Sequence, residues 1–151
     1  MTSVHTWLVF LHLLGATVWV GAWAAICLFA ADAVRRPEED ALRRLYRVMR
    51  SLGPVVIGPS TLLVLAAGIA LVVRSDRTAV TDLWIILGLV LYAAVTLVGV
   101  LGLGRASRTA TAALDRGDLP AATAATRGWL AMAVVVTGLL LLATADMVFR
   151  P

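Results

Sequence analysis

Four long apolar runs dominate the chain, and almost all of its charged residues lie in the gaps between them. The runs cover Thr6–Ala31, Val55–Val73, Leu83–Leu103 and Trp129–Val148. Each run has 19 to 26 residues, and a helix needs about 20 to cross the hydrocarbon core of a bilayer. A backbone in lipid must satisfy its hydrogen bonds internally, so the pattern predicts four transmembrane helices.

The predicted fold class is all-α: a polytopic membrane protein built as an antiparallel bundle of four transmembrane helices. We expect one transmembrane domain over residues 1–151, because long helices joined by short turns favour up-down-up-down packing. The composition agrees, since 61% of the residues are hydrophobic and only 15% are charged.

The first and third connections have helical patterns of their own. After Pro37, a group of acidic residues marks a helix start, and apolar residues then recur at helical spacing through Leu52 with arginines between them. This pattern predicts a basic amphipathic helix at the cytoplasmic surface. In the third connection, Gly117 is expected to end one helix and Asp118 to cap the next. Pro54 and Pro59 predict a kink where the second membrane helix begins.

The arginines predict the orientation. The first and third connections carry ten of them, whereas the second connection and the termini carry three. By the positive-inside rule we expect the first and third connections to face the cytoplasm of a bacterium. Both termini are then expected on the outer side of its cytoplasmic membrane. The net charge of +4 therefore reflects topology, and nucleic acid is not an expected partner. The expected surroundings are the lipid bilayer, with a homo-oligomer or a larger membrane complex as further possibilities.

Two histidines on the first membrane helix are the candidate functional residues. His5 and His12 are seven residues apart, about 10 Å along one helix face, and Trp19 extends the same stripe. Ionisable groups deep in a membrane tend to face a protein interior and to serve function. Gly15 and Ala16 beside His12 leave room for a flat ligand.

The functional hypothesis is that His12 ligates haem iron, or copper, through a neutral imidazole nitrogen. The alternative is a histidine that only hydrogen-bonds to a neighbouring helix or a headgroup. His5 is too far along the helix to ligate the same iron, so a second axial ligand would be another residue type, water or a histidine of a second protomer.

Asp146 is the other ionisable residue within an apolar run, and Arg150 follows it by one helical turn. An ion pair at the interface is one interpretation. The other is a carboxylate that orients a histidine or passes protons, with His5, Asp146 and Arg150 as outer partners of a His12 site.

The first-helix segment His12-Leu-Leu-Gly-Ala-Thr-Val-Trp19-Val-Gly21 resembles the pattern of small bacterial membrane proteins that include copper-resistance D-type proteins and haem-binding membrane protoporphyrinogen oxidases. Gly53-Pro-Val-Val-Ile-Gly-Pro59 and the closing Met147-Val-Phe-Arg-Pro151 resemble a related group of four-helix proteins. This resemblance implies that His12 is the axial ligand of haem b. With the small residues that leave room beside it and the Trp19 of the pattern, the expected site consists of His12, Gly15, Ala16 and Trp19.

Two features of this chain depart from the pattern of the oxidase family. No lysine is present, although the oxidase family is associated with a functional one, and Trp19 leads into Gly21-Ala22-Trp23 instead of a Leu-Pro-Arg-like segment. Oxidase activity is therefore not expected. The leading hypothesis is a haem-b-binding membrane protein that passes electrons. The alternatives are a non-catalytic structural or accessory bundle and a copper-handling protein.

Overall fold

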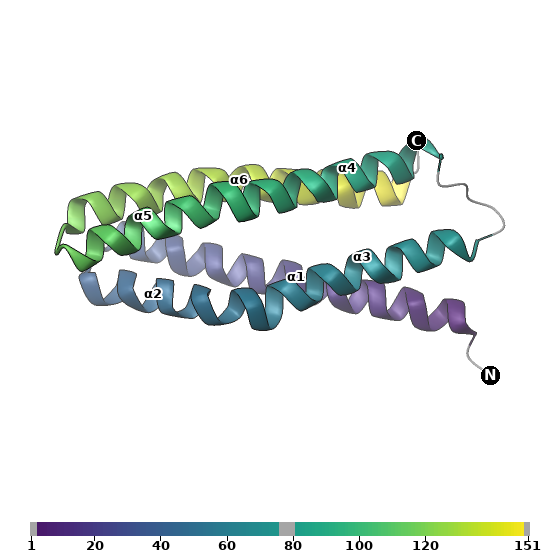
Figure 1. Cartoon of the computed structure of the whole chain (residues 1–151), viewed down its shortest axis with the longest axis horizontal. Coiled ribbons are helices and arrows are strands. Elements are labelled where there is room, and N and C mark those ends of the chain that lie inside the picture. Colours follow the sequence, from purple (N-terminus) through teal and green to yellow (C-terminus); the bar gives the residue numbers. More distant parts are fainter. Residues whose placement is uncertain (1–2, 76–80, 150–151) are drawn as a thin grey trace. The chain divides into compact units, whose positions relative to one another are not determined.

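A computed structural model describes residues 3–75 and 81–149, which form helices and contain no strand. The helices follow one another in an order that fits the predicted connections (Figure 1). They are α1 (Val4–Arg35), α2 (Glu39–Leu52), α3 (Gly58–Val73), α4 (Leu83–Leu97), α5 (Gly104–Asp115) and α6 (Leu119–Phe149), with π-helical segments η1 (Gly53–Ile57) and η2 (Val98–Leu103).

Four continuous helices in the described residues are long and apolar enough to cross a membrane. They are Val4–Arg35, Glu39–Val73, Leu83–Asp115 and Leu119–Phe149. In three of the four, only 17% of the most apolar window is buried inside the protein. A water-soluble protein buries most large apolar side chains, so this outward-facing surface suits lipid. The predicted all-α class with four membrane-length helices is confirmed.

The chain falls into two compact units. The first unit comprises Met1–Ile26 and Val48–Asp82, and the second comprises Cys27–Arg47 and Leu83–Pro151. In the second unit, α6 packs along both α4 and α5 (Figure 1). The single transmembrane domain over residues 1–151 stays a prediction.

Two prolines explain the π-helical turn of η1 in the first unit. Pro54 and Pro59 have no N–H to donate, so the α-helical hydrogen-bond pattern is broken on both sides of Gly58. The Gly58 N–H instead donates to the carbonyl of Gly53, five residues earlier. The Thr61 hydroxyl donates to the Gly58 carbonyl over 2.8 Å. The helix therefore stays continuous through a local change of winding, as the proline pattern predicted in part.

The turn between α5 and α6 in the second unit has the predicted caps. Gly117 adopts φ 72°, a left-handed conformation that glycine tolerates. Its N–H donates to the Leu114 carbonyl, and the Asp118 N–H donates to the Ala113 carbonyl, both over 3.0 Å. The Asp118 carboxylate then accepts the N–H of Ala121 at the start of α6. Both predicted caps are confirmed.

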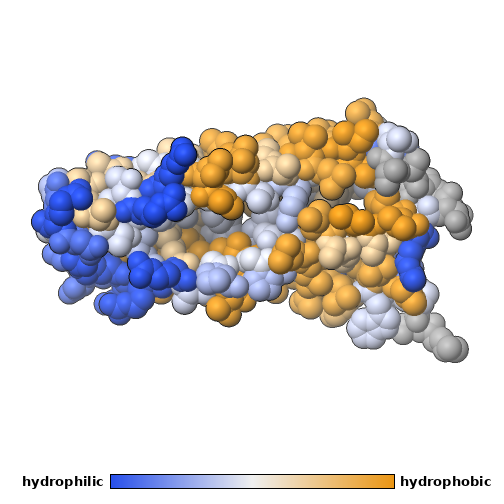
Figure 2. All heavy atoms as spheres, viewed as in Figure 1, coloured by the Kyte–Doolittle hydropathy of each residue, from blue (hydrophilic) through white to orange (hydrophobic). Residues whose placement is uncertain are grey.

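The amphipathic character of α2 is also confirmed. Leu42, Leu45 and Tyr46 are buried, while the arginines of α2 other than Arg43 are exposed. Arg43 donates to the Leu114 carbonyl over 2.7 Å and forms an ion pair with Asp115 at 3.3 Å, so it caps the end of α5. Figure 2 shows hydrophilic residues gathered over α2 and α5, whereas α4 and the second half of α6 present apolar surface.

Candidate functional site

The side chain of His12 is held by a backbone carbonyl of the neighbouring helix in the first unit. Its Nδ1 atom lies 2.9 Å from the carbonyl oxygen of Val64 in α3. A carbonyl only accepts hydrogen bonds, so Nδ1 carries the proton and donates it. In the neutral ring, the lone pair is then on Nε2, which fixes the tautomer that a metal or haem iron requires.

Gly68 gives the imidazole the space to reach α3. A Cβ atom built on Gly68 would lie 3.3 Å from His12 Cε1 and 3.4 Å from Nδ1. Both distances are at or below the close end of ordinary contact, so a side chain there would press on the ring edge. The edge of the ring that carries Nδ1 and Cε1 is therefore packed directly against the backbone of α3.

The second ring nitrogen is not engaged in the same way. Within the described residues, the structure gives His12 a hydrogen bond at Nδ1 and none at Nε2. The ring is half-buried, and the buried side-chain nitrogen and oxygen atoms without a partner in the described residues are the two oxygens of Asp146. Nε2 is therefore not one of the buried atoms that lack a partner. This arrangement orients the ring and leaves the free lone pair on Nε2.

Gly15 lies where α1 and α3 approach each other closely, and its expected place beside a ligand of His12 stays a prediction. A Cβ on this residue would lie 3.0 Å from Val64 Cγ2 and 3.2 Å from the Ser60 carbonyl oxygen. The space beside Gly15 is occupied by α3, so the missing side chain serves close helix packing. Ala16 is half-buried and Trp19 is 8% exposed, so the helix face that runs from His12 to Trp19 is covered by other parts of the protein.

The remaining candidates are His5, Asp146 and Arg150. His5 is exposed near the start of α1, as expected of a residue at the interface. Asp146 belongs to the second unit, where it is 6% exposed and neither carboxylate oxygen has a hydrogen-bond partner. Arg150 lies outside the described residues. The suggestion that these three support a His12 site stays a prediction.

The sequence did not identify the partners of His12. Val64 accepts this hydrogen bond through its backbone carbonyl. Every residue has the same backbone group, so no sequence signal singles out Val64. Gly68 is a visible small residue, but small residues are common in membrane helices. Among residues 3–75 and 81–149 there is also no group of three or more His, Cys, Asp or Glu residues placed to hold a metal ion.

These features define an integral membrane protein with four membrane-length helices and a histidine held between two of them. The chain matches the family described as "Predicted integral membrane protein (DUF2269)" over residues 6–151, and it belongs to that family. No curated protein and no solved structure matches the chain.

Proposed function

We propose that this membrane protein binds haem b through Nε2 of His12 and passes electrons. The observation that carries the proposal is the hydrogen bond from His12 Nδ1 to the Val64 carbonyl, which leaves the free lone pair of a half-buried ring on Nε2. Histidines that ligate metals commonly donate their other N–H to a carbonyl or a carboxylate, which orients the ring and raises the basicity of the ligating nitrogen.

The donor set suits haem better than a bare metal ion. Haem brings four ring nitrogens, so one imidazole from the protein is a sufficient anchor. A bare copper ion needs several protein ligands, and the described residues place no such group around His12. When bound, haem supplies one-electron chemistry, and the residues of this chain hold and orient its iron ligand. Copper handling stays the alternative suggested by the resemblance to copper-resistance D-type proteins.

Of the two histidines on α1, His12 alone would hold the haem. His5 lies seven residues before His12 on one helix, about 10 Å away along the axis, and does not reach the same iron. Water, a residue of another type or the histidine of a second copy completes the coordination. The last case makes the protein a homo-oligomer, with haem shared between protomers.

The proposed location is the bacterial cytoplasmic membrane with both termini outside. Ten of the 13 arginines lie in the first and third connections, which this orientation places in the cytoplasm. His12 then lies in the outer half of the membrane, within reach of electron donors or acceptors on that side.

The test is haem titration of purified apoprotein, followed by absorption spectroscopy. Wild-type protein should develop a Soret band that shifts on reduction with dithionite. His12→Ala should lose this band, whereas His5→Ala, which removes the other histidine of the same helix, should keep it. Loss of the band in His5→Ala alone would place the iron nearer the surface and overturn the assignment to His12.

A non-catalytic structural or accessory bundle is the second candidate, and one observation favours it. The same His12–Val64 hydrogen bond joins α1 to α3 and so stabilises the first unit without any cofactor. On this account His12→Ala lowers the stability of haem-free protein by about 1 kcal/mol, wild-type protein takes up no haem, and the bundle associates with a larger membrane complex.

A further inference from the structure

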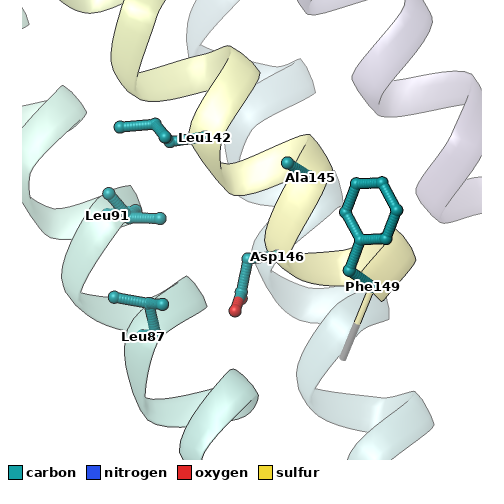
Figure 3. Close-up of a pocket in the computed structure, with 6 residues that line it drawn as sticks. All are labelled: Leu87, Leu91, Leu142, Ala145, Asp146 and Phe149. Atoms are coloured by element: carbon teal, nitrogen blue, oxygen red, sulfur yellow. The ribbon is translucent and has the colours of Figure 1, made fainter. Parts of the chain in front are cut away.

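A second site with different chemistry lies between α4 and α6 of the second unit. A pocket of about 310 Å³ opens there around the carboxylate of Asp146 (Figure 3). We call it the Asp146 pocket; its lining residues are Leu87, Leu91, Leu142, Ala145, Asp146 and Phe149. Apart from the carboxylate, these side chains offer hydrocarbon and one aromatic ring.

The carboxylate is buried without a hydrogen-bond partner. Asp146 is 6% exposed, and neither Oδ1 nor Oδ2 meets a donor in the described residues. Figure 3 shows the carboxylate directed away from the α6 backbone, and Oδ2 lies next to Gly88 of α4. An unsatisfied buried carboxylate is costly, and in native proteins such a group is commonly completed by a ligand or an ion.

The neighbouring helix places a glycine next to the carboxylate. A Cβ on Gly88 would lie 3.4 Å from Asp146 Oδ2, so glycine at this position leaves unfilled the space next to that buried oxygen that a side chain would occupy. Leu87 and Leu91, which flank Gly88 on α4, then form apolar walls on either side. The result is one carboxyl group in a space that is otherwise lined by hydrocarbon.

We propose that the Asp146 pocket binds a small lipophilic ammonium ion, independently of the His12 site. The N–H groups of the ammonium donate to the two free oxygens of Asp146, and its hydrocarbon portion lies against the leucines and Phe149. Such an ion satisfies both demands of the pocket, because it brings positive charge, hydrogen-bond donors and apolar surface together. A hydrated metal ion would find no other ligand among the lining residues.

The position along α6 gives such a ligand a route. Asp146 lies near the end of the apolar run of α6, and Trp84 near the start of α4 is of the type that marks a membrane–water interface. Amphiphilic amines gather at that interface, so the ligand enters sideways from the headgroup level without crossing the hydrocarbon core.

The experiment measures binding of hexylammonium and of 1-hexanol by isothermal titration calorimetry. The haem-free full-length protein is placed in phosphatidylcholine nanodiscs, and empty nanodiscs give the partition background. We expect wild-type protein to bind hexylammonium at least tenfold more tightly than hexanol, since hydrogen bonds to a charged group are the stronger kind. Equal affinity for the two probes, or no heat above the background, would overturn the proposal.

Variants assign the binding to the pocket. Asp146→Asn keeps the shape of the side chain but removes its charge, and it should abolish the preference for hexylammonium. Asp40→Asn removes an exposed carboxylate of the same unit and should bind as wild type does. Ala145→Leu narrows the pocket and should weaken both probes. An Asp146→Asn protein that folds, by circular dichroism, and still prefers hexylammonium refutes the site; if it does not fold, Ala145→Leu and the wild-type comparison decide.

Discussion

The buried hydroxyl pair between α2 and α6 allows a prediction with a defined order of effects. The hydroxyl oxygens of Tyr46 and Thr126 lie 2.8 Å apart, and Thr126 also donates to the Ala122 carbonyl of its own helix over 2.8 Å. A threonine hydroxyl has one proton, so Tyr46 must be the donor of the pair. Tyr46 is 6% exposed and Thr126 is fully buried, so a lost partner is not replaced by water.

The two single substitutions should therefore cost different amounts. Tyr46→Phe removes the donor but leaves Thr126 bonded to Ala122, so the free energy of unfolding should fall by about 1 kcal/mol. Thr126→Val leaves the buried Tyr46 hydroxyl without an acceptor. Because that hydroxyl is desolvated, the free energy of unfolding should fall by about 2 kcal/mol. The double variant has neither hydroxyl, so no buried hydroxyl is left without a hydrogen-bond partner. Its cost should be about 2 kcal/mol, below the sum of the two single costs.

The assay is unfolding of the purified protein in mixed micelles by increasing dodecyl sulfate, followed by circular dichroism. Thr144→Val on the same helix is the matched control, because the Thr144 hydroxyl is exposed and bonds only to the Leu140 carbonyl in the described residues. It should change stability by less than about 0.5 kcal/mol. Additive effects in the double variant, or a larger loss for Tyr46→Phe than for Thr126→Val, would refute the assigned donor.

Three further predictions follow from the packing and the charge distribution. Gly15→Ala places a methyl group against the backbone of α3 and should cost about 1–3 kcal/mol, whereas Gly21→Ala meets open space and should be neutral or stabilising in the same unfolding assay. Gly117→Ala should cost about 1–2 kcal/mol because of its φ of 72°, and an unchanged midpoint would contradict the capping role. Single cysteines at Arg44 and Arg116, in a background without the native cysteine, should resist an impermeant maleimide in intact cells; labelling of either position from outside would reverse the orientation.

The helices and their caps were predictable because local signals agree with one another. The apolar runs, the proline pair before Thr61 and the Gly117-Asp118 turn each act within one or two helical turns, where sequence determines geometry directly. The π-helical segment η2 was not predicted. It contains no proline, and there the Gly104 N–H donates back to the Gly99 carbonyl. A Cβ on Gly102 would lie 2.9 Å from Met132 Sδ, so packing against α6 accompanies this winding.

For the candidate sites, the sequence identified the residues but not their neighbours in the fold. His12 was identifiable as a deep imidazole, but the carbonyl that orients it comes from Val64, 52 residues later. The role of Gly15 was inferred from its size alone, and the neighbour that fills the space is visible only in the folded unit. Asp146 was noted as an ionisable residue within an apolar run, yet the absence of a partner in the described residues and the adjoining pocket required α4 and α6 to be placed together.

The central claim is that His12 holds a haem iron, and a reduced-minus-oxidised difference spectrum of purified protein tests it most directly. Wild-type protein expressed with haem available should show the Soret and α bands of haem b. His12→Ala should lack them while retaining wild-type helicity, and His5→Ala should show them at full intensity. Colourless wild-type protein that is folded and takes up no added haem would contradict the account and favour the structural bundle.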